Sequence, residues 1–132
     1  MADTRPWITC HALDTVSGRP AAGMQVVLEL LGPTSTQHLF EAKTNHDGRV
    51  TEWSPIGSSK EGLNEVVETT KANLNGAEQM EWKIKFHTEA YFGKGKTFYP
   101  FVEVPFFTRP EEGHYHVPLL LGPWSYTTYR GS

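Results

Sequence analysis

The sequence predicts an all-β protein built as a β-sandwich. Three observations support this prediction: apolar and polar residues alternate in about seven short segments, glycine and proline residues separate these segments, and only one segment has helical spacing instead. The chain has 132 residues, of which 38% are hydrophobic. This is the usual length of one domain and provides enough apolar material for a core. We therefore expect residues 1–132 to form a single domain.

The first strand is expected at residues 7–13. Its apolar residues Ile8, Cys10 and Ala12 alternate with His11, which therefore faces away from them. A glycine-containing turn follows this segment. The alternation then resumes in three more segments, which we expect to be strands: residues 24–30, 38–44 and 49–53.

A tight hairpin is expected between the last two of these strands. Its turn, residues 45–48, reads Asn-His-Asp-Gly and contains the Asp-Gly pair that is typical of such turns. The hairpin places Arg49 at the start of the next strand.

One helix is expected in the middle of the chain, at residues 61–74. Val66, Val67 and Thr70 share one face at helical spacing. An Asn-Gly pair follows and is a common helix end.

Three further strands are expected after the helix. In the first of them, Trp82 and Ile84 alternate with charged residues. The second covers residues 98–108, where Pro105 favours an edge position or a bulge because proline cannot donate a ladder hydrogen bond. The third covers residues 114–121.

The charge and cysteine content exclude several classes of partner and site. The formal net charge is −3, the pI is about 6.0, and lysine and arginine do not cluster, so we expect neither nucleic acid nor an anionic membrane as a partner. Cys10 is the only cysteine, which excludes an internal disulfide and a cysteine zinc finger. No apolar leader and no apolar run of about 18 residues occurs. We expect a soluble intracellular protein, in the cytoplasm or the peroxisome.

The C-terminal segment, residues 114–132, differs from a frayed polar end. It contains an apolar run followed by three large aromatic residues, which predicts that it docks against the rest of the protein. His114 and His116 are two residues apart on an expected strand and therefore point to the same side. Because imidazole has a pKa suited to proton transfer near neutral pH, this segment is a candidate part of a site.

Several segments together resemble one known family. The matching segments are HYHVPLLL (114–121), YRGS (129–132), HALDT (11–15), TNHDGR (44–49), AYF (90–92) and FYP (98–100). In this order they resemble the 5-hydroxyisourate hydrolases, transthyretin-like enzymes of purine catabolism. The resemblance implies a transthyretin-like sandwich of two four-stranded antiparallel sheets with one short helix, assembled as a homotetramer. Residues 54–81 are longer than the matching part of that family, so we expect a peripheral, helix-containing insertion there.

The resemblance also implies a reaction and its residues. The reaction is the hydrolytic opening of the six-membered ring of 5-hydroxyisourate, without metal or cofactor. His11 and His116 match the positions for proton transfer, and Arg49 matches a clamp for the negative charge on oxygen. Which histidine is the base stays open. The implied substrate-binding residues are Tyr129, Arg130, Ser132 and His114.

Three alternatives compete with this interpretation. A metal site would use the same histidines, but only Glu111 and Glu112 add carboxylates near ligand spacing. A transthyretin-like carrier would bind small molecules without catalysis, although carrier transthyretins lack the YRGS end and replace the active-site histidines and arginine. A secreted structural module of the same group would be expected to have a signal peptide or disulfides. The histidines at positions 38, 46 and 87 are expected to be exposed or hairpin residues.

Overall fold

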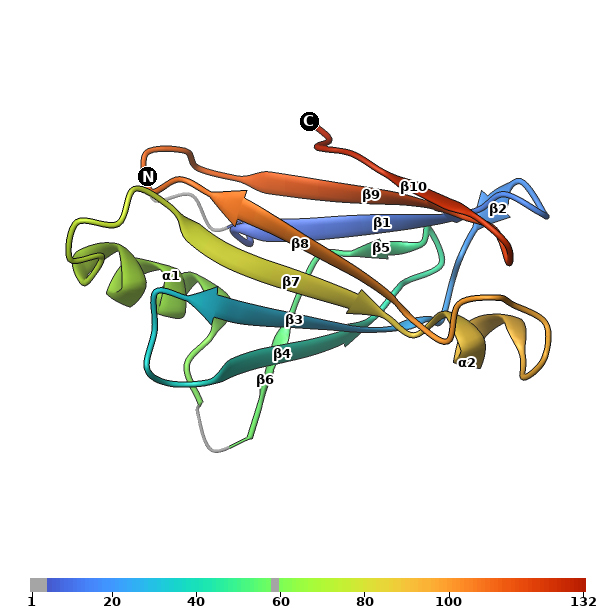
Figure 1. Ribbon diagram of the computed structural model, residues 1–132, viewed down its shortest axis with the longest axis horizontal. Coiled ribbons are helices and arrows are strands. Elements are labelled where there is room, and N and C mark those ends of the chain that lie inside the picture. The colour runs from blue at the N-terminus through green and yellow to red at the C-terminus, as the bar shows by residue number, and fades with distance from the viewer. Residues whose placement is uncertain (1–4, 58–59) are drawn as a thin grey trace.

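Two β-sheets pack face to face in the computed structural model, which describes residues 5–57 and 60–132 (Figure 1). Sheet A contains β1 (Ile8–Asp14), β2 (Arg19–Pro20), β5 (Arg49–Val50), β9 (Tyr115–Leu121) and β10 (Tyr126–Thr128). Sheet B contains β3 (Gln25–Gly32), β4 (His38–Lys43), β6 (Ser54–Ile56), β7 (Met80–Phe86) and β8 (Val102–Thr108). The helices in these residues are α1 (Leu63–Ala72) and α2 (Thr88–Phe92). The predicted all-β sandwich is confirmed.

Two details of the sheets differ from the expectation. Within the described residues each sheet has five strands rather than four, because strands of two or three residues, such as β2 and β10, are too short to show an alternation. Sheet A is also not purely antiparallel, since β1 and β9 pair in parallel over seven residues. These two strands are separated by most of the chain, so no hairpin forces them to run in opposite directions.

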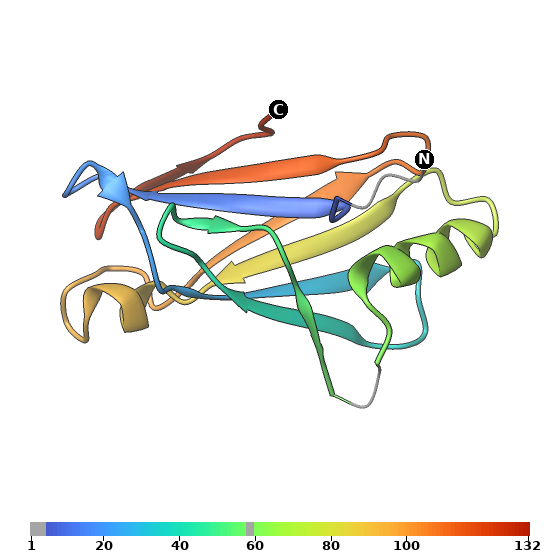
Figure 2. The ribbon, with the colours of Figure 1, turned by 180° about the vertical axis from the view of Figure 1, so that it is seen from behind.

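The strand expected at residues 49–53 is divided between the two sheets. β5 ends at Val50, and the chain then crosses to sheet B and forms β6 (Figure 2). β5 is therefore a short strand on β1, and its first residue, Arg49, is exposed.

The alternation of apolar residues sets the two faces of each sheet. Ile8 and Cys10 of sheet A and Trp82 and Ile84 of sheet B are fully buried between the sheets. Burial of each large apolar side chain stabilises the fold by roughly 1.5–3 kcal/mol. The residues between them in sequence, including His11, project from the opposite face. The outer face of sheet A therefore carries the polar side chains of β1.

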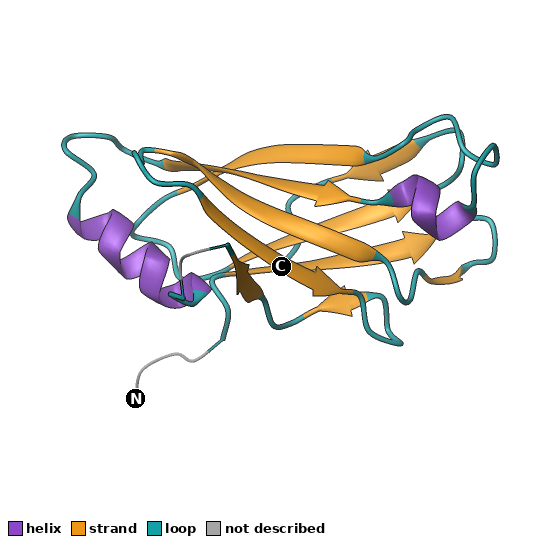
Figure 3. Cartoon of the chain, turned by 90° about the horizontal axis from the view of Figure 1, so that it is seen from below, coloured by secondary structure: helices purple, strands orange, loops and turns teal. Residues whose placement is uncertain are grey.

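The predicted helix is confirmed as α1, which packs at one end of the sandwich (Figure 3). It begins at Leu63, two residues later than expected, and buries Val66 and Val67. The backbone N–H of Trp7 donates a hydrogen bond to Asn64 Oδ1 at 2.8 Å, which ties the helix to the segment before β1. Positions 58 and 59 lie outside the described residues, and the status of residues 54–81 as an insertion stays a prediction.

The short helix α2 lies at the other end of the sandwich and was not predicted (Figure 3). It has five residues, too few to show helical periodicity. Long-range contacts hold it instead: Thr88 Oγ1 donates to the Tyr99 carbonyl and the Tyr91 hydroxyl donates to Asp14 Oδ2, both at 2.8 Å.

The proline in β8 lies on an edge strand, as predicted. β8 ends the strand order of sheet B, and Pro105 lies opposite Lys83 of β7. β10 is likewise at an edge, that of sheet A. In the part of the chain that the structure describes, no helix is long and apolar enough to cross a membrane.

Candidate active site

Three neighbouring strands of sheet A supply the central residues of the site. His11 lies in β1, Arg49 begins β5 and His116 lies in β9. His11 pairs directly with Arg49, and Thr9, two residues before His11, pairs with His116. Because alternate residues of a strand share a face, these side chains come together on the outer face of sheet A.

The hairpin between β4 and β5 sets the position of Arg49. Asn45 Oδ1 accepts hydrogen bonds from the N–H groups of Asp47 at 2.9 Å and Arg49 at 3.0 Å. Gly48 has a φ of +74°, and a Cβ at this position would lie only 2.3 Å from the Ala12 carbonyl oxygen. Glycine is therefore required for both its backbone conformation and its lack of a side chain, and the hairpin lies directly against β1.

The same hairpin orients the His11 imidazole. Nε2 of His11 lies 2.8 Å from the Asp47 carbonyl oxygen, and because a carbonyl only accepts, Nε2 is the donor. In neutral His11 the other nitrogen, Nδ1, is then free to accept a proton. The ring centroids of His11 and His116 are 6.4 Å apart, so both imidazoles can contact one small molecule.

The His116 imidazole is held by Thr9 and favours its neutral form. Nδ1 of His116 lies 2.7 Å from Thr9 Oγ1. Burial lowers the pKa of His116 from its ordinary value of 6.5, and the charges of Arg49, His11 and His114 lower it further. A neutral imidazole at pH 7 can accept a proton, which is what a general base must do.

His114 lies next to this pair and is anchored on its other side. Its Nδ1 lies 2.8 Å from the Pro6 carbonyl oxygen, and its Nε2 lies 3.4 Å from Thr9 Oγ1. Thr9 is thus situated between the two histidines.

Part of this cluster lines a hollow of about 190 Å³, which we call the histidine hollow. Its wall includes Thr9, Arg49, His114, His116 and Ser132. Sites for drug-sized ligands usually measure about 300–1,000 Å³. The histidine hollow therefore suits a compact molecule of one or two rings.

The C-terminal tail, residues 128–132, is hydrogen-bonded to β9, and the predicted docking of this end is thus confirmed. Thr128 Oγ1 donates to the Pro118 carbonyl at 2.8 Å, and the Gly131 N–H donates to the His116 carbonyl at 2.8 Å. A Cβ on Gly131 would lie 2.8 Å from His116 Cδ2 and 2.9 Å from Pro118 Cγ. The tail can therefore lie against the His116 ring only because Gly131 has no side chain, and this position brings Ser132 to the histidine hollow.

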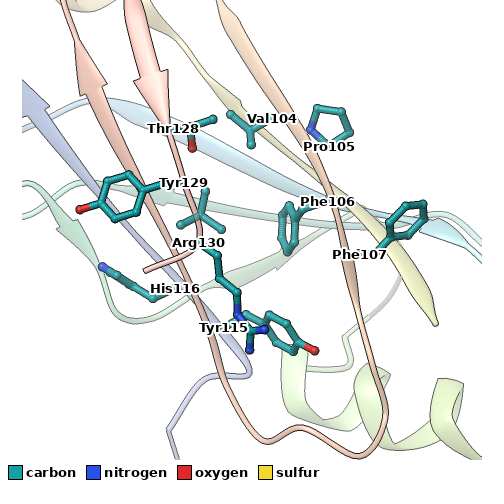
Figure 4. Close-up of a pocket in the computed structure, with 10 residues that line it drawn as sticks. Val104, Pro105, Phe106, Phe107, Tyr115, His116, Thr128, Tyr129 and Arg130 are labelled. Atoms are coloured by element: carbon teal, nitrogen blue, oxygen red, sulfur yellow. The ribbon is translucent and has the colours of Figure 1, made fainter. Parts of the chain in front are cut away.

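Tyr129 and Arg130 line a separate apolar groove of about 220 Å³ between β8, β9 and the tail (Figure 4). The Arg130 guanidinium donates to the Glu112 carboxylate and lies 4.6 Å from the centroid of the Tyr115 ring. This hydrogen bond lowers the pKa of Glu112, so the pair stays ionised at neutral pH. Arg130 thus anchors the tail to the loop before β9.

The structure brings five of the expected site residues together and sets two apart. The five are His11, Arg49, His114, His116 and Ser132. Tyr129 and Arg130 lie in the apolar groove, and His116 lines both the groove and the histidine hollow. Neither Thr9 nor the contact of Glu112 with Arg130 could be found from sequence patterns, because only the pairing of β1 with β9 places Thr9 beside His116 and only the folded tail brings Arg130 to Glu112.

The other described histidines lie elsewhere. His38 is half-buried in β4, His46 is exposed in the hairpin, and His87 precedes α2. Among residues 5–57 and 60–132, no group of three or more His, Cys, Asp or Glu side chains is placed to hold a metal ion. The expected independence from metal stays a prediction for solution experiments.

The two-sheet sandwich is of the transthyretin-like type, and the histidine hollow on the outer face of sheet A is its candidate small-molecule site. The HIUase/Transthyretin family model matches residues 8–131, and the chain belongs to this family.

Individual relatives agree with this assignment. The chain is 41% identical to a Schizosaccharomyces pombe protein named probable 5-hydroxyisourate hydrolase, over 96% of this chain and 92% of that protein. It is 38% identical to the 5-hydroxyisourate hydrolase of Mus musculus over the full length of both. Among solved structures, (S)-allantoin synthase has a TM-score of 0.71 at 31% identity, covering 98% of this chain and 45% of that one. Sea bream transthyretin in complex with thyroxine has a TM-score of 0.69 at 22% identity, covering 95% and 94%; this last likeness shows the fold alone.

The role of Gly48 can be tested against a matched glycine. Gly18 also has a positive φ, but a Cβ there would meet nothing within 4 Å. We expect Gly18→Ala to lower the free energy of unfolding by about 1 kcal/mol through backbone strain. Gly48→Ala should cost about 2 kcal/mol more, since it also forces β1 and the hairpin apart. Urea unfolding at equal protein concentration measures both, and equal losses would contradict the contact with Ala12.

Proposed function

We propose that this chain is a 5-hydroxyisourate hydrolase. It opens the six-membered ring of 5-hydroxyisourate by hydrolysis and yields 2-oxo-4-hydroxy-4-carboxy-5-ureidoimidazoline in purine catabolism. The observation that carries the proposal is the clustering of two imidazoles and one guanidinium: Arg49 and His116 line the histidine hollow, while His11 pairs with Arg49 and its ring lies 6.4 Å from that of His116. Relatives that match nearly the whole chain have this activity in their names.

The reaction requires one base, one acid and one group that stabilises an oxyanion. A neutral imidazole takes a proton from water while the water oxygen bonds to the ring carbonyl carbon, and the C=O electron pair moves onto oxygen. When this oxyanion collapses, the ring C–N bond breaks. The departing nitrogen takes a proton from an imidazolium, so the net change is the addition of one water molecule.

We assign His11 and His116 to the proton transfers and Arg49 to the oxyanion. Each histidine keeps one ring nitrogen in a hydrogen bond, to Asp47 or to Thr9, and has the other nitrogen left for the reaction. The Arg49 guanidinium can form charge-assisted hydrogen bonds to the developing oxyanion. In comparable sites the loss of one oxyanion donor costs about 2.7–4 kcal/mol of transition-state stabilisation.

We assign His114 and Ser132 to the wall of the substrate site, and Tyr129 and Arg130 to its support. His114 and Ser132 line the histidine hollow itself. Tyr129 and Arg130 lie behind His116 in the apolar groove, where the pairing of Arg130 with Glu112 supports the tail that carries Ser132.

We further propose a homotetramer. Among the described strands, β8 and β10 each have a strand neighbour on one side only, and Phe107 and Trp124 are 57% and 67% exposed. Open edges and exposed large aromatic side chains favour covering by another chain. A closed symmetric assembly of identical subunits satisfies both.

The alternative of a carrier without catalysis is less well supported. The shared fold with sea bream transthyretin does not distinguish a carrier from an enzyme. The wall of the histidine hollow carries two histidines, one arginine, two threonines and a serine beside Cys10 and Val50. This wall suits proton transfer and charge stabilisation rather than the binding of an apolar ligand.

The function is tested by following the decay of freshly generated 5-hydroxyisourate. Urate oxidase produces the compound in situ, and absorbance reports its disappearance at neutral pH. We expect the protein to accelerate the decay, and the acceleration to persist with a strong chelator. Decay at the spontaneous rate would reject the enzyme, and activity lost on chelation and restored by zinc would reject the metal-free mechanism.

The pKa of His116 predicts the pH dependence of catalysis. A base must be unprotonated, and the pKa of His116 is lowered from 6.5, so kcat/KM should stay constant through neutral pH and fall only below about pH 6.5. His116→Asn should remove this limb and reduce kcat/KM at least about tenfold, which is 1.4 kcal/mol. His46→Ala, at an exposed site, is the control and should keep both. A midpoint above pH 6.5 in the wild type would contradict the assignment.

The tail contact predicts an effect of Gly131. Gly131→Ala places a methyl group against the His116 ring and Pro118, which should displace the tail and lower kcat/KM by more than about tenfold, with little change in melting temperature. Gly113→Ala is the matched control, because a Cβ there meets nothing within 4 Å. Full activity of Gly131→Ala would show that the tail position does not matter for catalysis.

A further inference from the structure

We infer that Thr9 and His114 act as positioning residues that fix the tautomer of His116, so that its Nε2 is the unprotonated nitrogen. The inference rests on the proposed function, because it assigns to His116 the form that a general base needs. It follows from the order of four groups in space: the Pro6 carbonyl, the His114 imidazole, the Thr9 hydroxyl and the His116 imidazole.

The Pro6 carbonyl determines which ring nitrogen of His114 carries the proton. The carbonyl oxygen of Pro6 can only accept a hydrogen bond, so Nδ1 of His114, 2.8 Å away, must be the donor. A neutral imidazole carries one proton. Nε2 of neutral His114 is therefore an acceptor, and it faces Thr9 Oγ1 at 3.4 Å.

The hydroxyl of Thr9 has one proton, which it can donate to only one of the two histidines. A hydroxyl donates one hydrogen bond and accepts others, and His114 Nε2 can take part in a hydrogen bond with Thr9 only if Thr9 donates to it. Thr9 then presents a lone pair to His116. Nδ1 of His116, 2.7 Å from the same oxygen, must supply the proton of that hydrogen bond.

These hydrogen bonds determine the tautomer of His116. With its proton on Nδ1, neutral His116 has an unprotonated Nε2. The opposite tautomer would leave two acceptor nitrogens, one on each histidine, competing for the one Thr9 proton. An unsatisfied acceptor at a partly buried site is unfavourable, so the chain of hydrogen bonds selects the tautomer with Nε2 free.

Substitutions of Thr9 test this series of hydrogen bonds. Thr9→Val keeps a β-branched side chain, which suits a strand, and removes only the hydroxyl function. Thr9→Ser keeps the hydroxyl and serves as the matched control. A merely structural role for Thr9 would not distinguish these variants by the tautomer of a neighbouring ring.

The experiment combines kinetics with ¹⁵N NMR of the histidine side chains in the full-length protein at neutral pH. In the wild type and Thr9→Ser we expect His116 to carry its proton on Nδ1. In Thr9→Val we expect a substantial population with the proton on Nε2 and a kcat lower by about tenfold, with KM changed much less. A wild-type His116 protonated on Nε2, or an unchanged tautomer in Thr9→Val, would overturn the inference.

Substitution of His114 provides a second test. His114→Phe removes the acceptor that orients the Thr9 hydroxyl, so it should shift the tautomer of His116 in the same direction. Because both residues act through one hydrogen-bond chain, Thr9→Val combined with His114→Phe should lose no more kcat than the more damaging single variant. Losses that multiply would show that the two residues act separately.

These outcomes separate the inference from the proposed function. A wild-type protein that fails to accelerate decay of 5-hydroxyisourate rejects the function. The NMR measurement then still shows whether Thr9 and His114 fix the tautomer of His116. An active wild type whose His116 tautomer does not respond to Thr9 or His114 rejects the inference and leaves the function intact.

Discussion

The parallel pairing of β1 with β9 is the constraint on which the rest of the site depends. It runs in register from Ile8 opposite Tyr115 to Asp14 opposite Leu121. A slip by one residue would turn every side chain of β1 to the other face, which would bury His11 and expose Cys10. Ile8, Cys10 and Ala12 of β1 are fully buried, so the core holds the register, and the register in turn holds Thr9 beside His116.

The site combines positive charge with an imidazole, that of His116, whose pKa is lowered by burial and by neighbouring charges. Arg49 carries a permanent charge, and together with burial it keeps a proton away from His116. The same charge attracts an oxyanion at the moment it forms. In the reaction that we propose, one guanidinium therefore favours the base form of the histidine before the reaction and stabilises the transition state during it. Arg49 and His116 both line the histidine hollow, so both effects act in one place.

The faces of the strands could be predicted from the sequence because alternation is a local property. Ile8 and Cys10 are buried and His11 is not, as their positions in β1 indicate. Contacts between distant segments could not be predicted in this way. Thr9 and His116 are 107 residues apart, and the Glu112 partner of Arg130 depends on how the tail folds back across β9. The helix α2 could not be predicted because hydrogen bonds to distant residues, Asp14 of β1 and Tyr99, rather than its own periodicity, hold it in place.

The burial of Cys10 gives the protein a natural reporter of its own opening. This residue is the only thiol in the chain and is fully buried in β1, and burial raises its pKa. A thiol in this state does not react with an alkylating reagent while the sheet is closed. The rate of alkylation therefore measures how often β1 separates from its neighbours. A chemical label at one atom can in this way record the local stability of the strand that carries Thr9 and His11.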